Sequence, residues 1–198
     1  QAFMGRTHSN AWSQAPRFFA CPIQPVRHTI CARDATALRA FARRWGWRHY
    51  STDWKEVCAH EEIDLVDVGT PNHLHAPMAQ AALAAGKPVA CEKPLAGTLQ
   101  DARAMRDAAK AAKVPTFVWY NYRRCPAVAL AHQLVRKGKV GQIRRVRARY
   151  LQDWADESVP LLWRFERKYA GSGAHGDLNA HIIDMARFVT GQEVTEVC

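Results

Sequence analysis

Residues 65–94 read LVDVGTPNHLHAPMAQAALAAGKPVACEKP, and this stretch decides the fold. It opens on a largely apolar run, Leu65 to Gly69, continues through the helical pattern His75 to Ala85, and returns to an apolar run at Val89 to Cys91. Runs that are apolar at successive positions are typical of strands buried on both faces of a parallel sheet. The stretch therefore predicts two parallel strands joined by a crossover helix.

The same alternation continues on both sides of this stretch. Further strand and helix candidates follow one another at Val26 to Cys31, Ala35 to Trp45, His49-Tyr50, Trp54 to Ala59, Leu99 to Ala112 and Thr116 to Tyr120. Gly46 and Gly86 stand where helix C-caps are expected, and Thr98 is a candidate N-cap. We therefore expect residues 1–121 to form a doubly wound α/β domain with a parallel sheet.

The pattern changes after Asn121. It indicates a helix from Pro126 to Lys137, a basic strand from Ile143 to Leu151, a helix from Asp177 to Thr190 and a short strand from Val194 to Val197. This different rhythm predicts a second domain over residues 122–198. Because two strands make no stable sheet alone, we expect this domain to be incomplete.

The beginning of the chain carries a cofactor signal. Ala2-Phe3-Met4-Gly5 leads into a helical pattern and resembles the end of a glycine-rich dinucleotide loop, in which helix N-H groups face a pyrophosphate. A general helix entry is the alternative. If the loop is present, its first glycine and the preceding strand lie upstream of Gln1, and the sheet has a gap at that central strand. We then expect residues 1–198 alone to be insoluble or molten.

Composition restricts the class of protein. The chain has 198 residues, 48% of them hydrophobic, and a formal net charge of +10, but its apolar runs are far shorter than the roughly 20 residues of a membrane helix. Arg145, Arg147 and Arg149 alternate with apolar residues, so we interpret them as a solvated or subunit-contact face, with an anionic-ligand surface as the alternative. No nucleic-acid recognition motif accompanies them. The six cysteines lack a C-x-x-C pair, which favours reduced thiols and a cytoplasmic protein.

Three residues carry acid-base chemistry. Lys93 follows a buried strand, and Asp177 and His181 are four residues apart, so they share a helix face with Asp184. A histidine is suited to accept a hydroxyl proton near neutral pH, and a lysine stabilises developing alkoxide charge. The alternatives are a helix N-cap for Asp177 and a structural histidine. A zinc site at His175, Asp177 and His181 lacks a convincing further ligand, so we expect no metal.

The end of the Val26 to Cys31 run bears on the choice of cofactor. An acid at this place binds the ribose 2'-hydroxyl of NAD, whereas a small residue followed by arginine accommodates the 2'-phosphate of NADP. Ala32 and Arg33 occupy the place and slightly favour NADP. A register shift of two residues instead puts Asp34 there and favours NAD.

Several motifs together resemble the Gfo/Idh/MocA family, the glucose-fructose oxidoreductase and inositol dehydrogenase group. They are Phe3-Met4-Gly5-Arg6-Thr7-His8, Thr70-Pro71-Asn72, Ala84-Ala85-Gly86-Lys87, Glu92-Lys93-Pro94, Asn121-Tyr122-Arg123, Gly138-Lys139-Val140-Gly141 and Gly176-Asp177 to His181. The resemblance implies a Rossmann-type domain followed by an incomplete α+β substrate and oligomerisation domain with an open, mainly antiparallel sheet. It also implies an NAD(P)-dependent oxidoreductase acting on a sugar, inositol or related polyol, and a homo-oligomer, dimer or tetramer, when full length.

The resemblance also implies residue roles. Lys93 would hydrogen-bond the reacting oxygen, Asp177 would orient substrate and histidine, and His181 would be the general acid/base. The expected cofactor contacts are Phe3, Met4, Gly5, Arg33, Thr70, Pro71, Asn72, His75, Glu92, Lys93 and Asn121. The expected substrate contacts are Lys93, Tyr122, Arg123, Trp163, Asp177 and His181. Two rival functions stay open: a glycosidase that uses bound NAD transiently, and a cofactor-binding regulator without chemistry.

Overall fold

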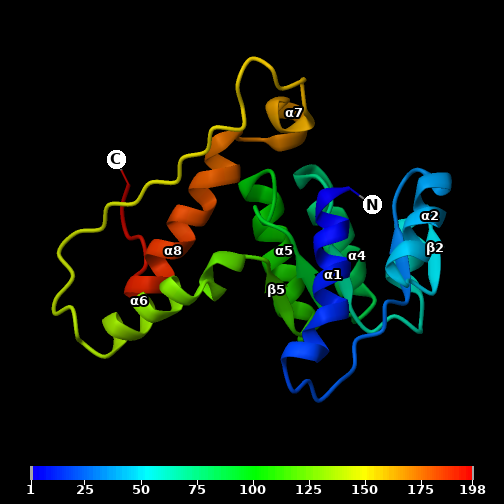
Figure 1. Ribbon diagram of the computed structural model, residues 1–198, viewed down its shortest axis with the longest axis horizontal. Helices are drawn as coiled ribbons and strands as arrows, with labels where there is room; N and C mark the ends of the chain where they lie inside the picture. The colour runs from blue at the N-terminus through cyan, green and yellow to red at the C-terminus, as the bar shows by residue number, and fades with distance from the viewer. Residues whose placement is uncertain (1, 198) are drawn as a thin grey trace. The chain divides into compact units, whose positions relative to one another are not determined.

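The computed structural model describes residues 2–197 and divides into two compact units (Figure 1). The first unit contains the chain up to Thr70 together with Leu74–Cys91 and Gln100–Phe117. The second contains Pro71–His73, Glu92–Leu99 and the chain from Val118 onward.

The strands of the first unit form two separate parallel sheets. One pairs β1 (Thr29–Cys31) with β2 (His49–Ser51), with Thr29 opposite His49. The other has the order β3 (Val66–Val68), β4 (Val89–Cys91) and β5 (Thr116–Val118), with β3 parallel to β4. The predicted strands are confirmed in position, and the sheet has the predicted break between its two halves.

Five helices alternate with these strands: α1 (Phe3–Phe18), α2 (Ala35–Trp45), α3 (Trp54–Ala59), α4 (His75–Ala84) and α5 (Leu99–Ala112). Local capping explains several of their limits. The Asp34 carboxylate accepts a hydrogen bond from the Ala37 N-H, and the Asp53 carboxylate accepts one from the Lys55 N-H. Helices α2 and α3 therefore begin at acidic N-caps. Gly46 ends α2 in the left-handed conformation at φ 67°, as its place in the sequence predicts.

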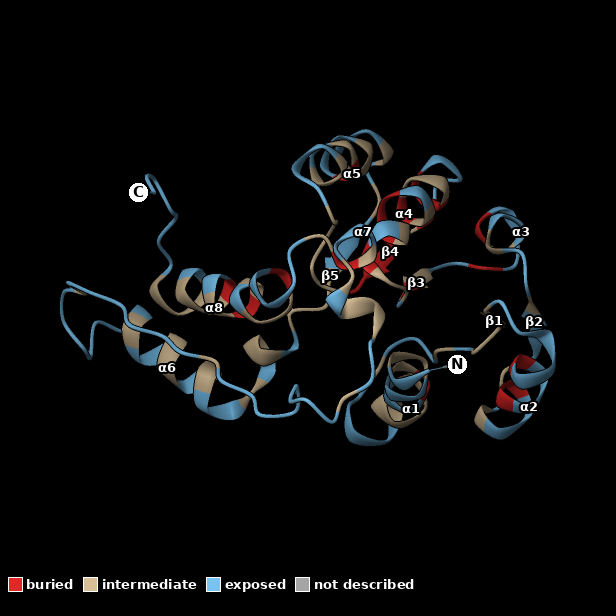
Figure 2. Cartoon of the chain, turned by 90° about the horizontal axis from the view of Figure 1, so that it is seen from above, coloured by how far each residue is buried: buried red, intermediate tan, exposed pale blue. Residues whose placement is uncertain are grey.

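The core of this unit lies where α4 meets β3 and β4, and along the inner face of α2 (Figure 2). Helix α4 buries small side chains, with Ala79 and Ala82 at 1% and 0% exposure, which allows the helix to approach the strands closely. Leu38 of α2 is also fully buried. These contacts supply the hydrophobic stabilisation that holds the strand ends in place.

Helix α1 is held by polar contacts to both halves of the sheet. His8 Nδ1 and Trp12 Nε1 each lie 2.9 Å from Asp67 Oδ2 on β3. On the other side, Trp47 Nε1 donates to Ser9 Oγ at 3.0 Å, just before β2. Because Ser9 is fully buried, this bond satisfies a hydroxyl that would otherwise be costly to bury.

The second unit is helical. Its elements are the 3-10 turns Asn121–Arg124 and Trp163–Phe165, α6 (Pro126–Arg136), the short α7 (Arg167–Ala170), a π-helical turn His175–Asn179 and α8 (Ala180–Thr190). Helix α6 packs against α8, where His132 stacks on Phe188 with ring centroids 4.2 Å apart. The predicted helices at 126–137 and 177–190 are confirmed, with the first turn of the latter π-helical rather than α-helical.

Two sequence predictions for this unit need correction. Residues 143–151 and 194–197 are extended or irregular but form no strand, so the described residues of the second unit contain no open antiparallel sheet. The alternation of basic and apolar residues is compatible with a strand, but a strand also needs a hydrogen-bonded neighbour, which residues 143–151 lack. Within residues 2–197, no helix is both long enough and apolar enough to cross a bilayer.

Candidate active site

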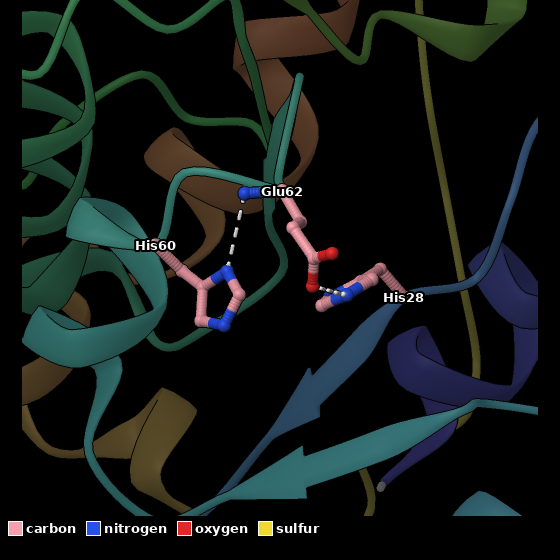
Figure 3. Close-up of side chains that lie close together, drawn as sticks. All are labelled: His28, His60 and Glu62. Carbon is pink, nitrogen blue, oxygen red and sulfur yellow. Dashed lines mark hydrogen bonds and ion pairs between the residues drawn. The ribbon is translucent and has the colours of Figure 1, made fainter.

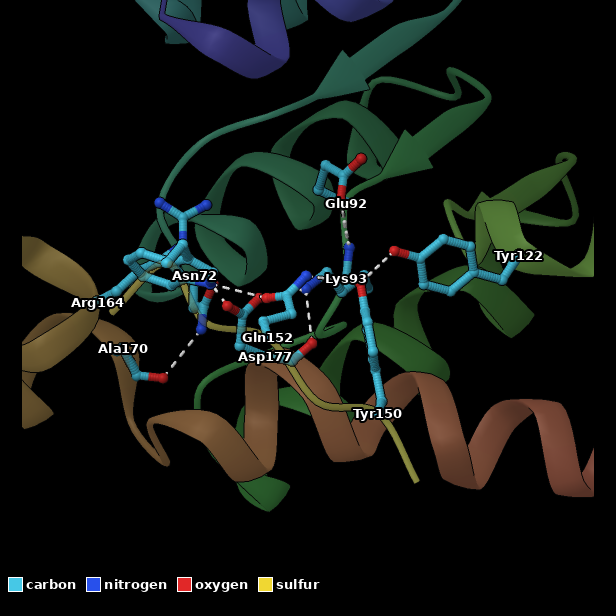
Figure 4. A network of polar contacts seen from close by, with 10 residues as sticks. Asn72, Glu92, Lys93, Tyr122, Tyr150, Gln152, Arg164, Ala170 and Asp177 are labelled. Atoms are coloured by element: carbon cyan, nitrogen blue, oxygen red, sulfur yellow. Dashed lines mark hydrogen bonds and ion pairs between the residues drawn. The ribbon is translucent and has the colours of Figure 1, made fainter. Parts of the chain in front are cut away.

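Lys93 is the cation of the site. It follows β4 directly, and its N-H donates to Glu92 Oε2 at 3.1 Å. Its Nζ donates to the Oδ1 atom of Asp177 at 2.5 Å and to the Asp177 carbonyl oxygen at 2.9 Å (Figure 4). The Lys93 side chain is only 16% exposed, so two charge-assisted bonds hold the ammonium group in one place.

Asp177 lies in the π-helical turn that precedes α8. Besides Lys93, its carboxylate faces Arg164, whose Nε is 3.9 Å from Oδ2. Arg164 in turn lies over the ring of Trp163 at 4.6 Å, a cation-π distance. A π turn widens the helix locally and is frequent at functional sites. The carboxylate therefore lies between two cations rather than capping the helix.

His181 is the buried histidine of the candidate site. Its side chain lies in α8 at 5% exposure, and Nδ1 has no hydrogen-bond partner among residues 2–197. The Tyr122 ring centroid is 4.5 Å from that of His181. Burial, followed by the charge of Lys93, lowers the pKa of His181 below its ordinary value of 6.5. The imidazole is therefore neutral at neutral pH and ready to accept a proton.

Asp177 does not orient His181 by a hydrogen bond in the described structure, since its oxygens face Lys93 and Arg164 and Nδ1 of His181 has no partner. Its influence on the histidine is electrostatic. The negative charges of Asp177, Glu92 and Asp184 each oppose the lowering of the His181 pKa. A buried ring nitrogen without a partner is a place where a substrate hydroxyl or a water completes the hydrogen bonding.

Arg123 makes a two-pronged ion pair with Asp184. Its Nε and NH2 groups donate to the two carboxylate oxygens at 2.8 and 2.5 Å, and Asp184 is 5% exposed. The hydrogen bond to Asp184 raises the pKa of Arg123, so the guanidinium stays charged. This geometry makes Arg123 a brace between the 121–124 turn and α8 rather than a free substrate contact.

Tyr122 belongs to a chain of polar aromatic contacts. Its hydroxyl shares a short hydrogen bond with that of Tyr150, which also accepts from Gln152 Nε2 at 2.9 Å. Trp154 Nε1 donates to Gln152 Oε1 at 2.8 Å. The bond to Tyr150, together with burial, raises the pKa of Tyr122 to about 12. Tyr122 therefore stays protonated near neutral pH and does not suit the role of a base.

The turn after β3 is built by buried hydrogen bonds. His75 is fully buried and its Nε2 lies 2.8 Å from the Thr70 carbonyl oxygen, so we assign it to holding the turn rather than to direct cofactor contact. Within the second unit, Asn72 is 7% exposed and its Nδ2 donates to the Ala170 carbonyl oxygen at 2.9 Å. Pro71 is half-buried and Asn121 is exposed at the start of its 3-10 turn.

The N-terminus of α1 suits an anionic group. Ala2 occupies the N-cap position without a side-chain hydrogen bond, and the first turn contains no acidic residue. The N-H groups of Phe3, Met4 and Gly5 are therefore left to a ligand or to water, at the positive end of a 16-residue helix. These are the residues predicted at the pyrophosphate, and their geometry fits a dinucleotide.

The end of β1 bears on the ribose of such a dinucleotide. Asp34 caps α2 through a 2.9 Å bond from Ala37 N-H, whereas Arg33 is exposed. The carboxylate of Asp34 is therefore engaged by the helix, and Ala32 and Arg33 are the residues at the strand end.

Comparison with known proteins assigns the chain. Residues 2–120 match the family model described as "Oxidoreductase family, NAD-binding Rossmann fold", and residues 128–198 match the GFO/IDH/MocA C-terminal domain. The chain belongs to the GFO/IDH/MocA oxidoreductase family. Its first unit is thus an NAD-binding Rossmann fold, and the resemblance noted from sequence motifs is confirmed.

Several family members are similar over almost the whole chain. Levoglucosan dehydrogenase of Pseudarthrobacter phenanthrenivorans is 46% identical over 96% of this chain and 49% of its own length. D-apiose dehydrogenase of Paraburkholderia graminis is 32% identical over 96% of the chain and 48% of its own length. A solved levoglucosan dehydrogenase in complex with NADH and levoglucosan superposes with a TM-score of 0.94 at 46% identity, covering 96% of this chain and 52% of that one. The chain spans about half the length of the curated relatives it matches.

Three residues of the site were not predicted from the sequence. Tyr150 and Gln152 were placed in or beside an expected basic strand, and Arg164 in an irregular stretch. The structure brings all three to the Lys93 and Asp177 region of this family member (Figure 4). No local sequence pattern identifies them, because Tyr150 contacts Tyr122 and Arg164 contacts Asp177, residues that lie far from them in the sequence.

Proposed function

We propose that the full-length protein is an NAD(P)-dependent dehydrogenase acting on a sugar, inositol or related polyol. It oxidises a secondary hydroxyl to a ketone or catalyses the reverse reduction. The observation that carries this proposal is the pairing of a fixed ammonium group, Lys93, with a buried neutral imidazole, His181, in one unit. These are the two groups that the removal of a hydroxyl proton requires.

The residues divide the proton chemistry between them. Lys93 hydrogen-bonds the reacting oxygen and stabilises its negative charge as the O-H bond breaks. His181 accepts the proton during oxidation and returns it during reduction. Asp177 holds the Lys93 ammonium group in place through its 2.5 Å bond. The nicotinamide, when bound, supplies the hydride acceptor or donor at its C4 position.

The substrate class and the cofactor have separate support. Relatives that are 46% and 32% identical are named levoglucosan and D-apiose dehydrogenases, which favours a carbohydrate substrate. The levoglucosan dehydrogenase structures contain NADH. In this chain, the exposed Arg33 and the capping role of Asp34 support acceptance of NADP as well.

We also propose a cytoplasmic homo-oligomer that binds neither nucleic acid nor membrane. None of the five cysteines within residues 2–197 forms a disulfide, which suits a reducing compartment. Burial raises the pKa of Cys31 to about 11, so this thiol is protonated and unreactive. Size-exclusion chromatography with light scattering on the full-length protein measures the oligomeric state, and a monomer would contradict that part.

The test of activity follows the absorbance of reduced nicotinamide with the full-length protein, a panel of sugars and inositols, and NAD and NADP in turn. We expect net cofactor reduction with at least one polyol. Release of a hydrolysis product without net reduction would instead identify a glycosidase, and binding without turnover a regulator. Either outcome overturns the proposed dehydrogenase.

The variant His181→Ala tests the assigned base. We expect turnover to fall roughly 10²- to 10⁴-fold, the usual share of a positioned acid/base, with little change in cofactor affinity. The matched control is His175→Ala, because His175 is exposed, lies on the adjoining turn, and its ring forms a hydrogen bond with Asn179 Nδ2 on the same turn. Near-normal turnover in His181→Ala would refute the assignment.

A further inference from the structure

A second cluster of functional groups lies in the first unit, apart from the proposed catalytic residues. It consists of His28, His60 and Glu62, whose ligand-type atoms all lie within 4.8 Å of one another (Figure 3). Among residues 2–197 this is the group of three that brings metal-binding atoms together, whereas His175, Asp177 and His181 do not. Nothing in the proposed dehydrogenase mechanism uses these side chains.

His28 is held in a defined orientation. Its Nδ1 lies 2.8 Å from Thr29 Oγ1, and its Nε2 lies 3.3 Å from Glu62 Oε2. The side chain is only 14% exposed, whereas Glu62 is 75% exposed and reaches toward it from the surface. A histidine whose other ring nitrogen is fixed by a neighbouring oxygen is the usual arrangement of a metal ligand.

The segment that carries the other two ligands is rigidly built. The Lys87 ammonium group, 9% exposed, donates to the carbonyl oxygens of His60 at 2.7 Å and Ile63 at 2.6 Å. The N-H of Glu62 donates to His60 Nδ1 at 3.2 Å, so Nδ1 is the unprotonated nitrogen of the His60 ring. The backbone of this segment is therefore held in place before any ligand arrives.

The cluster lies beside an open space. A pocket of about 300 Å³ is lined by two of its members, His60 and Glu62, together with Thr29, His49 and Glu56, whereas His28 is not among the lining residues. The His49 ring lies 4.8 Å from that of His28, between ring centroids. The His60 imidazole and the Glu62 carboxylate both border this space, and water can fill the remaining coordination positions of an ion.

A simple ion pair between protonated His28 and Glu62 is the alternative explanation. That pair uses one histidine and is weak at a surface where one partner is 75% exposed. It does not involve His60, whose ring centroid lies 5.2 Å from that of His28. One cation shared by both rings and the carboxylate accounts for all three side chains.

We propose that His28, His60 and Glu62 bind a divalent cation of the zinc type, with water completing a tetrahedral shell. Two imidazoles and one carboxylate form the donor set that suits Zn²⁺. Binding of the ion replaces the hydrogen bond between the Glu62 N-H and His60 Nδ1, and it links the residue before β1 to the segment after α3. This departs from the expectation of no metal, because residues 28 and 60–62 show no recognisable ligand spacing in the sequence.

The test is a calorimetric titration of chelator-stripped full-length protein with ZnCl₂. We expect saturable uptake of one equivalent per chain at this site and an increased melting temperature. The substitutions His28→Ala and Glu62→Gln should each weaken this uptake at least 10-fold. Glu62→Gln is the safer variant, since the side chain is mostly exposed and its loss leaves the core intact.

Two controls make the outcome decisive. His175→Ala, which lies in the second unit, should bind zinc as the wild type does, and cofactor binding should be unchanged in all variants. Cobalt(II) in place of zinc should give the intense visible bands of a tetrahedral site, lost in His28→Ala. Absence of saturable uptake, or uptake that survives both His28→Ala and Glu62→Gln, overturns the proposal.

Discussion

The properties of His181 come from its neighbours rather than from its own chemistry. Burial in α8 lowers its pKa first, and the ammonium group of Lys93 lowers it further. Between the folded-state pKa and 6.5 the unfolded chain binds more protons, so the free energy of unfolding decreases as the pH falls through this window. The lowered pKa that keeps His181 neutral at neutral pH therefore makes the folded protein less stable in acid.

This dependence predicts a measurable shift in the His181 pKa. The full-length protein should show a His181 imidazole pKa below 6.5 by NMR titration, and Lys93→Met should raise it because a nearby positive charge is removed. Lys110→Met, an exposed lysine near the end of α5, is the control and should leave it unchanged. A His181 pKa that stays the same in Lys93→Met would show that the two groups do not interact.

For individual residues, the sequence indicated which side chains carry the chemistry better than which side chains contact one another. Lys93, Asp177 and His181 were chosen from their spacing and residue types, and the structure places Lys93 on Asp177. The sequence did not reveal that Arg123 is engaged by Asp184 or that Tyr122 bonds Tyr150. Such pairings depend on which side chains meet across long stretches of chain, and local patterns carry no information about that.

Among the elements, the turn after α7 is the most constrained. Gly171 has φ 81° and ψ −70°, and the Ser172 N-H donates to the Ala170 carbonyl oxygen at 3.1 Å. This is the geometry of a γ-turn that residues with a side chain adopt only under strain. A Cβ atom at Gly171 would also lie 2.9 Å from the Gly97 carbonyl oxygen, within the same unit.

We therefore expect Gly171→Ala to destabilise the full-length protein by about 2 kcal/mol or more, since backbone strain and a clash with backbone act together. Gly191→Ala is the matched control. Gly191 ends α8 at φ 70° with nothing near its Cβ position, so only the left-handed strain of about 1 kcal/mol applies. Urea unfolding measures both, and equal losses in the two variants would contradict the proposed clash.

The prediction of elements succeeded where the information was local. The helices over 35–45 and 54–59 are confirmed at the predicted limits, and Gly46 ends the first of them as expected, whereas the acidic N-caps Asp34 and Asp53 were not predicted. The expected strand at 143–151 failed, because pairing with a neighbour decides whether extended chain becomes a strand. The π turn at 175–179 has no sequence signal that we recognise.

At the scale of the whole chain, the strands of the first unit do not form one continuous sheet. Its strands have three residues each and are divided between a two-stranded and a three-stranded sheet. A two-stranded sheet is marginally stable by itself. Large apolar side chains also remain in solvent, with Phe3, Phe18 and Phe19 at 67%, 77% and 70% exposure. Hydrophobic burial is therefore small for a chain of this length.

This arrangement predicts the behaviour of the 198-residue polypeptide expressed alone. We expect retained helical far-UV circular dichroism, weak near-UV signals from its seven tryptophans and strong binding of a hydrophobic dye, the properties of a molten globule. Scanning calorimetry should show no cooperative peak, whereas a native chain of this length absorbs about 140 kcal/mol near 60 °C. The full-length protein is the control and should unfold sharply. A cooperative transition of that size in the 198-residue chain would show that the two sheets suffice for a native core.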